Sequence, residues 1–490
     1  MSKPNAAAIL YAALLIASIV QIFQGIILAH YFEPENQAPY RYGILVISFA
    51  YLFVSGFVES IFYFISGRYT PSARKYVGNT ILYCLLVFLI LILIFHLVLE
   101  PYVLVSTELN PFFREIGVYL FISFFLFFNL TAHNVLVGTE KSSAASVLRI
   151  FQSTFRLIII TTTLISGIIV SIYELILLIV LLEAFQSFLY GIVLLKKNLL
   201  SFHFRDTKIK EQYSYAFALG IAGVIPFINS SLDKIMVSTF LGAPSFVIYS
   251  ISAVELPLAG IITSVFGSVF FSTYVRYADS NNYLSMANLW RKCSLHGAII
   301  NIPLGVFVFL FSDELYQLIL PNTYFEGHRV LGIYALLLLL RFNSSDVLAK
   351  SLNRNVIIIQ AALIILIVNI LGNLFFINFL GLWGAAVATL VGIIVGWIYY
   401  IARYAKLLKT TIGHLFPWKP YIRLLTLSVI FFGGARLFFY RIEISLALIL
   451  LGLAIYSFYG FSLLDRPERE YVRGYIDKII NPLRALFNQK

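Results

Sequence analysis

Eight ionisable side chains lie inside long apolar stretches of this 490-residue chain, and they are its first candidates for chemistry. A charged group deep in a bilayer is costly, so such residues usually line a wet cavity, pair with one another, or bind an ion or a substrate. Cationic members can bind anionic groups, and carboxylates can take up a proton or a cation. The eight are Glu59, Arg156, Glu183, Asp233, Lys234, Glu255, Arg341 and Asp346.

Uncharged polar residues accompany several of these groups at helical spacing. Residues four apart share a helix face, so we expect such stripes to face a cavity or a partner helix rather than acyl chains. Glu59 and Arg156 have no oppositely charged neighbour in the sequence, and we expect both to line a cavity. The uncharged residues that we assign to the candidate binding face are Gln21, Gln24, Gln152 and Asn229.

Internal pairing is the main alternative to a binding role for the buried charges. Asp233 and Lys234 could snorkel to the outer end of their apolar stretch. Arg341 could form a buried ion pair with Asp346 or with Glu255, both of which are acidic. Both alternatives stay open on the sequence alone.

The sequence contains no constellation of residues typical of catalysis. Cys84 and Cys293 fit neither a disulfide framework nor a metal site, and no glycine-rich phosphate loop with lysine is present. Asp313 and Glu314 begin an outer loop, and we interpret them as a solvated acidic face. We therefore expect no enzyme activity, no metal and no cofactor.

Fourteen apolar stretches, each long enough to cross a bilayer, are predicted to be the helices that position these side chains. The chain is 60% apolar and only 12% charged, which is about half the charge of a soluble domain. The stretches lack the period-two alternation of barrel strands, so we predict an all-α polytopic membrane protein. They are 6–29, 43–66, 77–99, 112–137, 148–169, 173–195, 214–240, 246–273, 291–311, 329–349, 355–378, 382–403, 421–439 and 444–464.

The basic residues predict the orientation of these helices. Of 35 Lys and Arg residues, 27 fall on the N-terminus, the even-numbered connections and the C-terminal tail. Basic residues resist translocation, so that side is predicted to be cytoplasmic, with both termini in the cytoplasm. The net charge of +12 follows from this pattern and does not indicate a nucleic-acid partner.

The chain divides by pattern into two halves of six spans and two extra spans. Short similarities recur six spans apart, which predicts two like-oriented lobes related by a pseudo-twofold axis along the membrane normal. The basic connection 196–211 separates the halves. The predicted segments are 1–198, 199–410, 411–464 with two C-terminal helices, and 465–490, a basic amphipathic helix on the inner leaflet.

At residues 381–392 the sequence GLWGAAVATLVG resembles the small-residue signature of polysaccharide flippases. These flippases belong to the multidrug/oligosaccharidyl-lipid/polysaccharide exporter superfamily. The stretches 230–252 and 342–373 also look like that family. The resemblance is strongest over 214–405. The junction at 29–33 departs from the family pattern, because it has histidine where the family often has arginine.

The resemblance implies an inner-membrane flippase that moves a polyprenyl-diphosphate-linked oligosaccharide to the outer leaflet by alternating access. Arg156, Lys234 and Arg341 would then contact phosphate or sugar. The carboxylates Glu59, Asp233, Glu255, Asp346 and Glu183 would tune the site or bind a coupling H⁺ or Na⁺. Implied partners are the lipid-linked saccharide, membrane lipids and the polysaccharide polymerase machinery.

Two other functions remain open at this stage. A cation-coupled multidrug exporter of the sister family would suit the surplus of deep carboxylates. A membrane enzyme, such as a polymerase or glycosyltransferase, would need a large external loop with catalytic groups, and the longest outer loop is 312–328.

Overall fold

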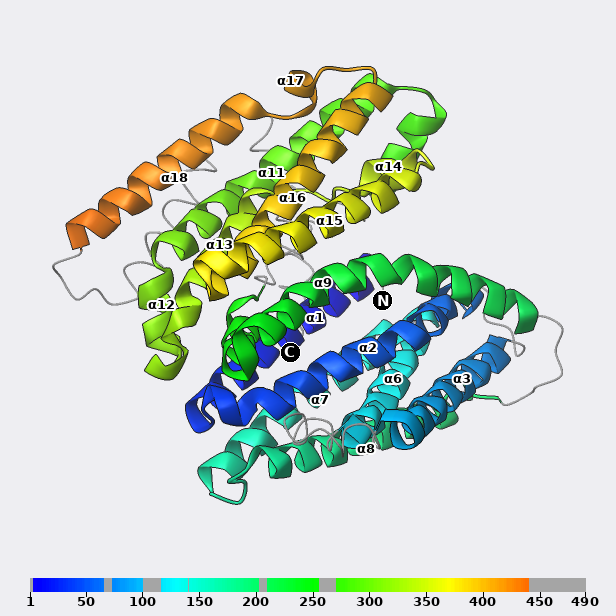
Figure 1. Cartoon of the computed structure of the whole chain (residues 1–490). Coiled ribbons are helices and arrows are strands. Elements are labelled where there is room, and N and C mark those ends of the chain that lie inside the picture. The colour runs from blue at the N-terminus through cyan, green and yellow to red at the C-terminus, as the bar shows by residue number, and fades with distance from the viewer. Residues whose placement is uncertain are drawn as a thin grey trace, which may run out of the picture. The chain divides into compact units, whose positions relative to one another are not determined.

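The computed structural model confirms an all-α, multi-pass membrane protein (Figure 1). It describes residues 3–65, 73–99, 116–139, 141–201, 209–254 and 270–439. Within these ranges every regular element is helical, and 11 helices are long and apolar enough to cross a membrane. The last predicted span, the amphipathic tail and Glu255 lie outside the described residues, so the count of fourteen stays a prediction.

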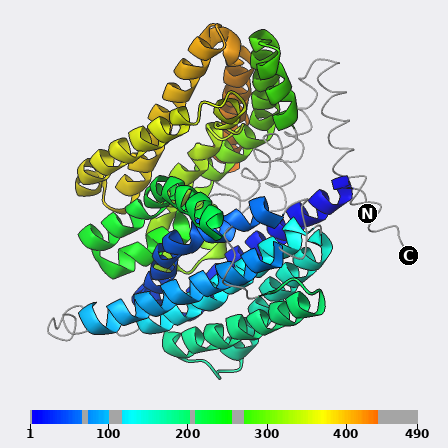
Figure 2. The same ribbon diagram turned by 90° about the vertical axis from the view of Figure 1, so that its right-hand side faces the viewer.

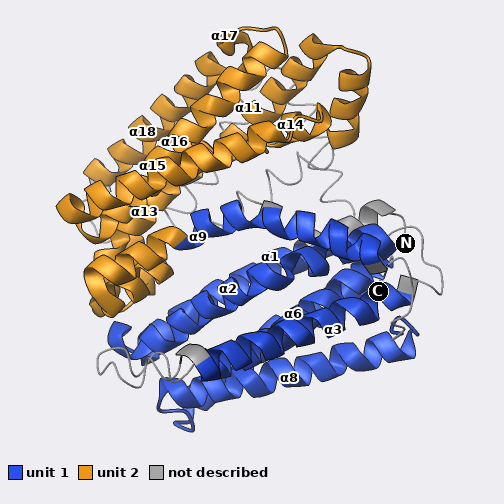
Figure 3. Cartoon of the chain, turned by 45° about the vertical axis from the view of Figure 1, so that its right-hand side comes forward, with its two compact units in different colours: residues 1–231 blue, residues 232–490 orange. Residues whose placement is uncertain are grey.

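The chain forms two compact units, residues 1–231 and 232–490 (Figure 3). The change of unit falls inside α9 (Ile209–Ser252), which is two helices in sequence. Gly242 separates them with φ 84° and ψ 178°, a conformation that only glycine adopts readily. The predicted segment boundaries at 198, 410 and 464 remain predictions.

Unit 1 is a bundle of long helices that lie alongside one another, blue to green in Figures 1 and 2. Its helices pack in the pairs α1 with α7, α2 with α6, and α6 with α8. At the start of α8, Ser171 and Glu174 form a reciprocal capping box that satisfies free backbone groups. Residues 209–231 of α9, called here its first part, belong to unit 1. The other α-helices of this unit are α1 (Lys3–Tyr31), α2 (Pro34–Ile65), α3 (Ala73–Ile94), α6 (Ile116–Gly138), α7 (Ser142–Ile165) and α8 (Ile172–Lys196).

Unit 2 is built around α11, which is buried along most of its length. A second close pair is formed by α15 and α16. The elements are α11 (Tyr283–Leu310), α12 (Ser312–Ile319), α13 (His328–Leu336), α14 (Val347–Ser351), α15 (Val356–Leu380), α16 (Leu382–Leu407), α17 (Ile412–Leu415) and α18 (Trp418–Phe439), with the last part of α9.

The small-residue signature is the contact surface between α15 and α16. Gly384, Ala385, Ala388 and Gly392 are buried, as the sequence predicts. A side chain at Gly384 would overlap the backbone carbonyl of Phe376 in α15. The two helices can therefore approach closely only because these side chains are absent or small.

The predicted span 329–349 is wrong as a continuous helix, because the chain leaves the helix between α13 and α14. Asn343 and Ser344 hydrogen-bond locally: the Ser344 amide donates to Asn343 Oδ1 at 2.8 Å. Such side chains compete with helical backbone bonds. Asn343 Nδ2 also donates to the Trp290 carbonyl at 3.2 Å, which anchors the irregular segment against α11. Non-helical backbone at membrane depth is tolerated when protein surrounds it.

The predicted acidic face of Asp313 and Glu314 is solvated, since the two side chains are 33% and 48% exposed, and it also carries an ion pair. Arg436 Nη2 of α18 lies 2.6 Å from Asp313 Oδ2 and 3.6 Å from Glu314 Oε1. Arg436 is too distant in sequence for the contact to be read from local pattern. Partial burial and a hydrogen bond with Asp313 raise the pKa of Glu314 to about 7.

Replacing Gly384 by alanine should lower the free energy of unfolding by about 1–3 kcal/mol, because the new methyl group overpacks the α15–α16 contact. Thermal unfolding in detergent measures this. Gly191→Ala in α8 is the matched control, because nothing lies within 4 Å of a Cβ there. Equal stability of the two variants would contradict the packing described.

The free energy of unfolding should fall as the pH rises from about 4.5 to about 7. In this range Glu314 is ionised in the unfolded chain but still protonated in the folded one, so ionisation favours unfolding. Glu314→Gln should remove this part of the pH dependence of the melting temperature. Glu326→Gln, at an exposed glutamate, should leave it unchanged. If the Glu314→Gln variant keeps the wild-type pH dependence of the melting temperature, the Glu314 carboxyl does not have a raised pKa and the prediction is wrong.

Candidate functional site

A buried carboxylate in unit 2 gathers hydrogen-bond donors from four segments. Asp233 of α9 is 4% exposed. Its Oδ2 accepts from the hydroxyls of Tyr249, at 3.1 Å, and Tyr334, at 3.4 Å, and its Oδ1 accepts from Asn373 Nδ2 at 3.0 Å. The Thr389 hydroxyl of α16 also donates to Oδ2. Snorkelling of Asp233 to the interface is therefore wrong, because these donors replace water around the carboxylate.

Further oxygens surround this carboxylate, and with it they form the Asp233 cluster: Asp233, Asn369, Asn373 and Thr389. Asn373 Nδ2 donates to Asn369 Oδ1 at 2.8 Å, and Asn369 Nδ2 donates to Thr389 Oγ1 at 3.2 Å. Asn373 Oδ1 is buried and has no hydrogen-bond partner among the residues that the structure describes. One carboxylate with amide and hydroxyl oxygens is a hard-oxygen set suited to a monovalent cation or a proton. In the described part of the chain, no Lys or Arg pairs with Asp233.

The close approach of α15 and α16 builds the Asp233 cluster. A Cβ atom added at Gly372 of α15 would lie only 3.0 Å from the Cβ of Ala388 in α16. At this close approach the Thr389 hydroxyl lies within hydrogen-bond distance of the Asn369 amide. Asn369, Asn373 and Thr389 are site residues that were not predicted from the sequence. Asn369 and Asn373 lie four apart in an apolar run, and the criterion that selected the other polar stripes would have found them.

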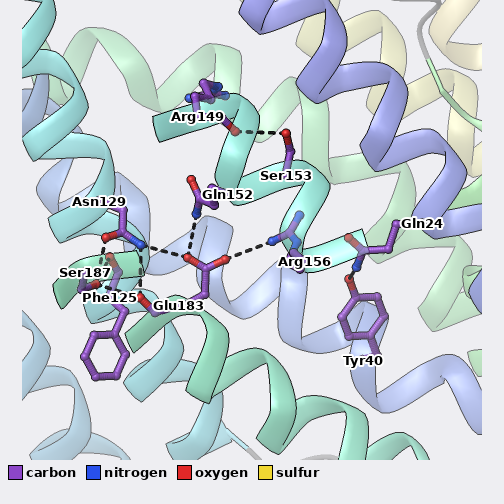
Figure 4. Close-up of polar contacts among 10 residues, drawn as sticks. All are labelled: Gln24, Tyr40, Phe125, Asn129, Arg149, Gln152, Ser153, Arg156, Glu183 and Ser187. Atoms are coloured by element: carbon purple, nitrogen blue, oxygen red, sulfur yellow. Dashed lines mark hydrogen bonds and ion pairs between the residues drawn. The ribbon is translucent and has the colours of Figure 1, made fainter. Parts of the chain in front are cut away.

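A second buried carboxylate lies in unit 1, and it is paired (Figure 4). Glu183 of α8 is 1% exposed and receives three donors at 3.0 Å: Arg156 Nη1 and Gln152 Nε2 from α7, and Asn129 Nδ2 from α6. Ser187 donates to Asn129 Oδ1 at 2.8 Å. The polar stripes of α7 and α8 thus face each other, as expected for stripes that meet a partner helix.

Arg156 keeps capacity to bind another group. Its side chain is 24% exposed, and its ion pair with Glu183 uses Nη1 alone. Its Nε is buried without a hydrogen-bond partner in the described structure. A guanidinium carries five donor hydrogens, so an anionic ligand could be bound beside Glu183.

The remaining candidates of unit 1 are dispersed over its helices. Gln24 is buried, and its Nε2 donates to the Tyr40 hydroxyl at 3.4 Å (Figure 4). Gln21 is exposed, and Asn229 is half-buried on α9. Glu59 lies in the wall of an open pocket.

The remaining candidates of unit 2 do not join the Asp233 cluster by any hydrogen bond or ion pair that we describe. Lys234 and Arg341 are half-buried. The expected ion pair of Arg341 with Asp346 is not the one that forms: Asp346 pairs with Lys350, one turn later. Glu255, the other expected partner, lies outside the described residues.

Comparison with known proteins supports the predicted resemblance. Residues 148–329 match the model of a family described as "Polysaccharide biosynthesis protein". None of the curated proteins matches the chain in sequence.

Solved structures match over most of the chain. One is titled "Lipid II flippase MurJ, inward closed conformation": it shares 15% identity with a TM-score of 0.72, covering 93% of this chain and 98% of the other. An inward-facing multidrug resistance MATE family transporter of the MOP superfamily has 15% identity and a TM-score of 0.61, covering 83% and 99%. The bent form of the Vibrio cholerae MATE transporter VcmN has 13% identity and a TM-score of 0.56, covering 84% and 98%.

The solved structures that match are titled as a flippase and as a transporter. The resemblance predicted from the sequence is confirmed in fold and in the matched segment. The chain has the fold of these solved flippase and transporter structures.

Proposed function

We propose that this protein is a flippase that moves a polyprenyl-diphosphate-linked oligosaccharide from the cytoplasmic to the outer leaflet of the inner membrane. The observation that carries the proposal is the extent of the structural match. The lipid II flippase covers 93% of this chain, whereas the multidrug transporters cover 83–84%. The match to a polysaccharide-biosynthesis family points to the same substrate class.

Alternating access is the mechanism that fits this proposal. The polar head of the substrate would enter from the cytoplasm while its lipid tail stays in the bilayer, and a conformational change would expose the head to the other side. Arg156 is the best placed of the candidate cations, because its remaining donors can bind a diphosphate oxygen. Lys234 and Arg341 stay candidates for the same task, and both termini would be cytoplasmic.

Coupling to a cation is proposed for the Asp233 cluster. Among the described residues, the cluster has one buried carboxylate that forms no ion pair with Lys or Arg, and an amide oxygen without a hydrogen-bond partner. A bound Na⁺ or proton would neutralise Asp233 and replace hydrogen bonds among its neighbours. Binding would thereby change the relative energies of conformations that hold these helices differently.

Arg156→Ala should reduce polysaccharide export by about tenfold or more at equal membrane abundance, because a charge-assisted contact worth roughly 1.5–3 kcal/mol is lost. The measurement is surface polysaccharide in a deletion strain complemented with each variant. Arg423→Ala, at an exposed arginine of α18, is the control.

The double variant Arg156→Ala/Glu183→Gln separates two roles for Arg156. If the arginine only neutralises Glu183, removing the orphaned charge restores export. If it contacts substrate, as proposed, export stays low. Full export by the single Arg156→Ala variant would remove the substrate role.

Asp233→Asn should abolish cation-dependent stabilisation. For a chain that binds Na⁺, replacing potassium chloride by sodium chloride should stabilise the wild type by about 2.7 kcal/mol at one hundred times the dissociation constant. Thermal unfolding in nanodiscs measures the shift, and Asp279→Asn, at an exposed aspartate, is the control.

Proton coupling gives a different outcome in the same experiment. Sodium then has no specific effect, and Asp233→Asn instead flattens the pH dependence of transport. A wild-type response to both ions that persists unchanged in Asp233→Asn would contradict coupling at this carboxylate.

A further inference from the structure

An open pocket of about 730 Å³ lies within unit 1, and none of its lining residues belongs to the Asp233 cluster or to the hydrogen-bond partners of Glu183 described above. Helices α2, α6 and the first part of α9 form its walls. The lining residues are Tyr51, Glu59, Phe62, Tyr63, Leu130, Asn134, Tyr215 and Leu219. These residues include no Lys or Arg, so the pocket is poorly suited to a diphosphate.

Aromatic faces dominate the pocket. Tyr63 and Tyr215 stack with ring centroids 4.5 Å apart and an interplanar angle of 22°. Tyr63 is 60% exposed and Tyr215 is 38% exposed, so the stacked pair still offers ring surface to a ligand. The close contact of Gly56 with Ala216 and Gly220 brings α2 against α9 and so fixes this pair.

Polar groups are set among these rings. The Tyr51 hydroxyl and the Glu59 carboxylate both line the pocket. Asn134 is buried, and its Nδ2 is anchored at 3.1 Å to the carbonyl of Val58. An aromatic belt at the membrane interface would account for Tyr63 and Tyr215, but not for a carboxylate and an amide in the same wall.

The pocket lies toward the predicted cytoplasmic ends of its helices. Glu59 and Tyr63 are within the last two turns of α2, and Asn134 is near the end of α6. Tyr215 is near the beginning of α9. The connections that follow or precede these ends are among the basic, cytoplasmic ones, so a head group arriving from the cytoplasm would reach this pocket early.

We infer that this pocket binds an uncharged sugar ring of the lipid-linked saccharide on its cytoplasmic side. The inference rests on the proposed function and deepens it by assigning the saccharide and the diphosphate to different residues. Apolar faces of a sugar ring pack on Tyr63 and Tyr215, and its hydroxyls hydrogen-bond Glu59 and Tyr51. A pocket of apolar walls with a few fixed polar groups gives orientation as well as affinity.

The first test compares variants for polysaccharide export at equal membrane abundance. Tyr63→Ala/Tyr215→Ala should lower export by about tenfold, whereas Tyr63→Phe/Tyr215→Phe keeps the rings and should stay within about threefold of wild type. Phe188→Ala, at an exposed aromatic residue of α8, should have no effect. Wild-type export by the double alanine variant would overturn the inference.

Glu59→Gln distinguishes a sugar from an organic cation. Glutamine still hydrogen-bonds hydroxyls, so export should fall by less than about threefold if the ligand is an uncharged sugar. A loss as large as that of the double alanine variant would overturn the inference in favour of a cation site, which needs the negative charge.

The closing experiment identifies the ligand directly. A photo-crosslinking phenylalanine analogue at Leu219, inside the pocket, is compared with the same analogue at Phe188, and adducts formed in native membranes are analysed by mass spectrometry. A saccharide-bearing lipid attached at position 219 and absent at 188 supports the inference. Phospholipid alone, or no difference between the positions, overturns it.

The two proposals fail in different ways. If deletion of the gene leaves surface polysaccharide unchanged, the flippase function fails, and the adduct at position 219 still decides what the pocket binds. If deletion abolishes export but the pocket variants and adducts behave like the controls, the flippase function stands and the pocket inference fails.

Discussion

A carboxylate buried among membrane helices must be surrounded by donors that replace water, and this constraint organises both units. Glu183 meets it with an arginine and two amides from α6 and α7. Within the described residues, Asp233 meets it with uncharged hydroxyl and amide donors. Burying an ion is costly, and a carboxylate that is paired with an arginine is stabilised more than one that is surrounded by neutral donors. The unpaired carboxylate is therefore the better candidate for reversible binding of a cation.

Close helix packing is what makes such donor sets reachable. Thr389 can approach Asn369 because the facing positions of α15 and α16 are glycine or alanine. In unit 1, glycines bring α2 against α9 beside the aromatic pocket. The same small residues therefore act on stability and on the position of polar groups. The site chemistry depends on backbone distances that only those residues permit.

The sequence predicted the helical class, the small-residue contact and the presence of polar stripes, because each is encoded in local hydropathy and spacing. It could not predict that Arg156 meets Glu183, since that contact depends on how α7 and α8 pack. The break after α13 was missed because hydrophobicity outweighed the local bonding of Asn343 and Ser344. Asn369 and Asn373 were overlooked because no charged residue accompanies them on α15, although Asn373 hydrogen-bonds Asp233 of another helix.

The most direct measurement is flipping by the purified chain in proteoliposomes that contain a fluorescent polyprenyl-diphosphate saccharide. An imposed sodium or proton gradient should drive the saccharide to the opposite leaflet, and Asp233→Asn liposomes should respond to neither gradient. Gradient-independent flipping that is identical in the wild type and the variant would contradict ion-coupled transport through this carboxylate. No flipping of the lipid-linked saccharide under any gradient would contradict the flippase function itself.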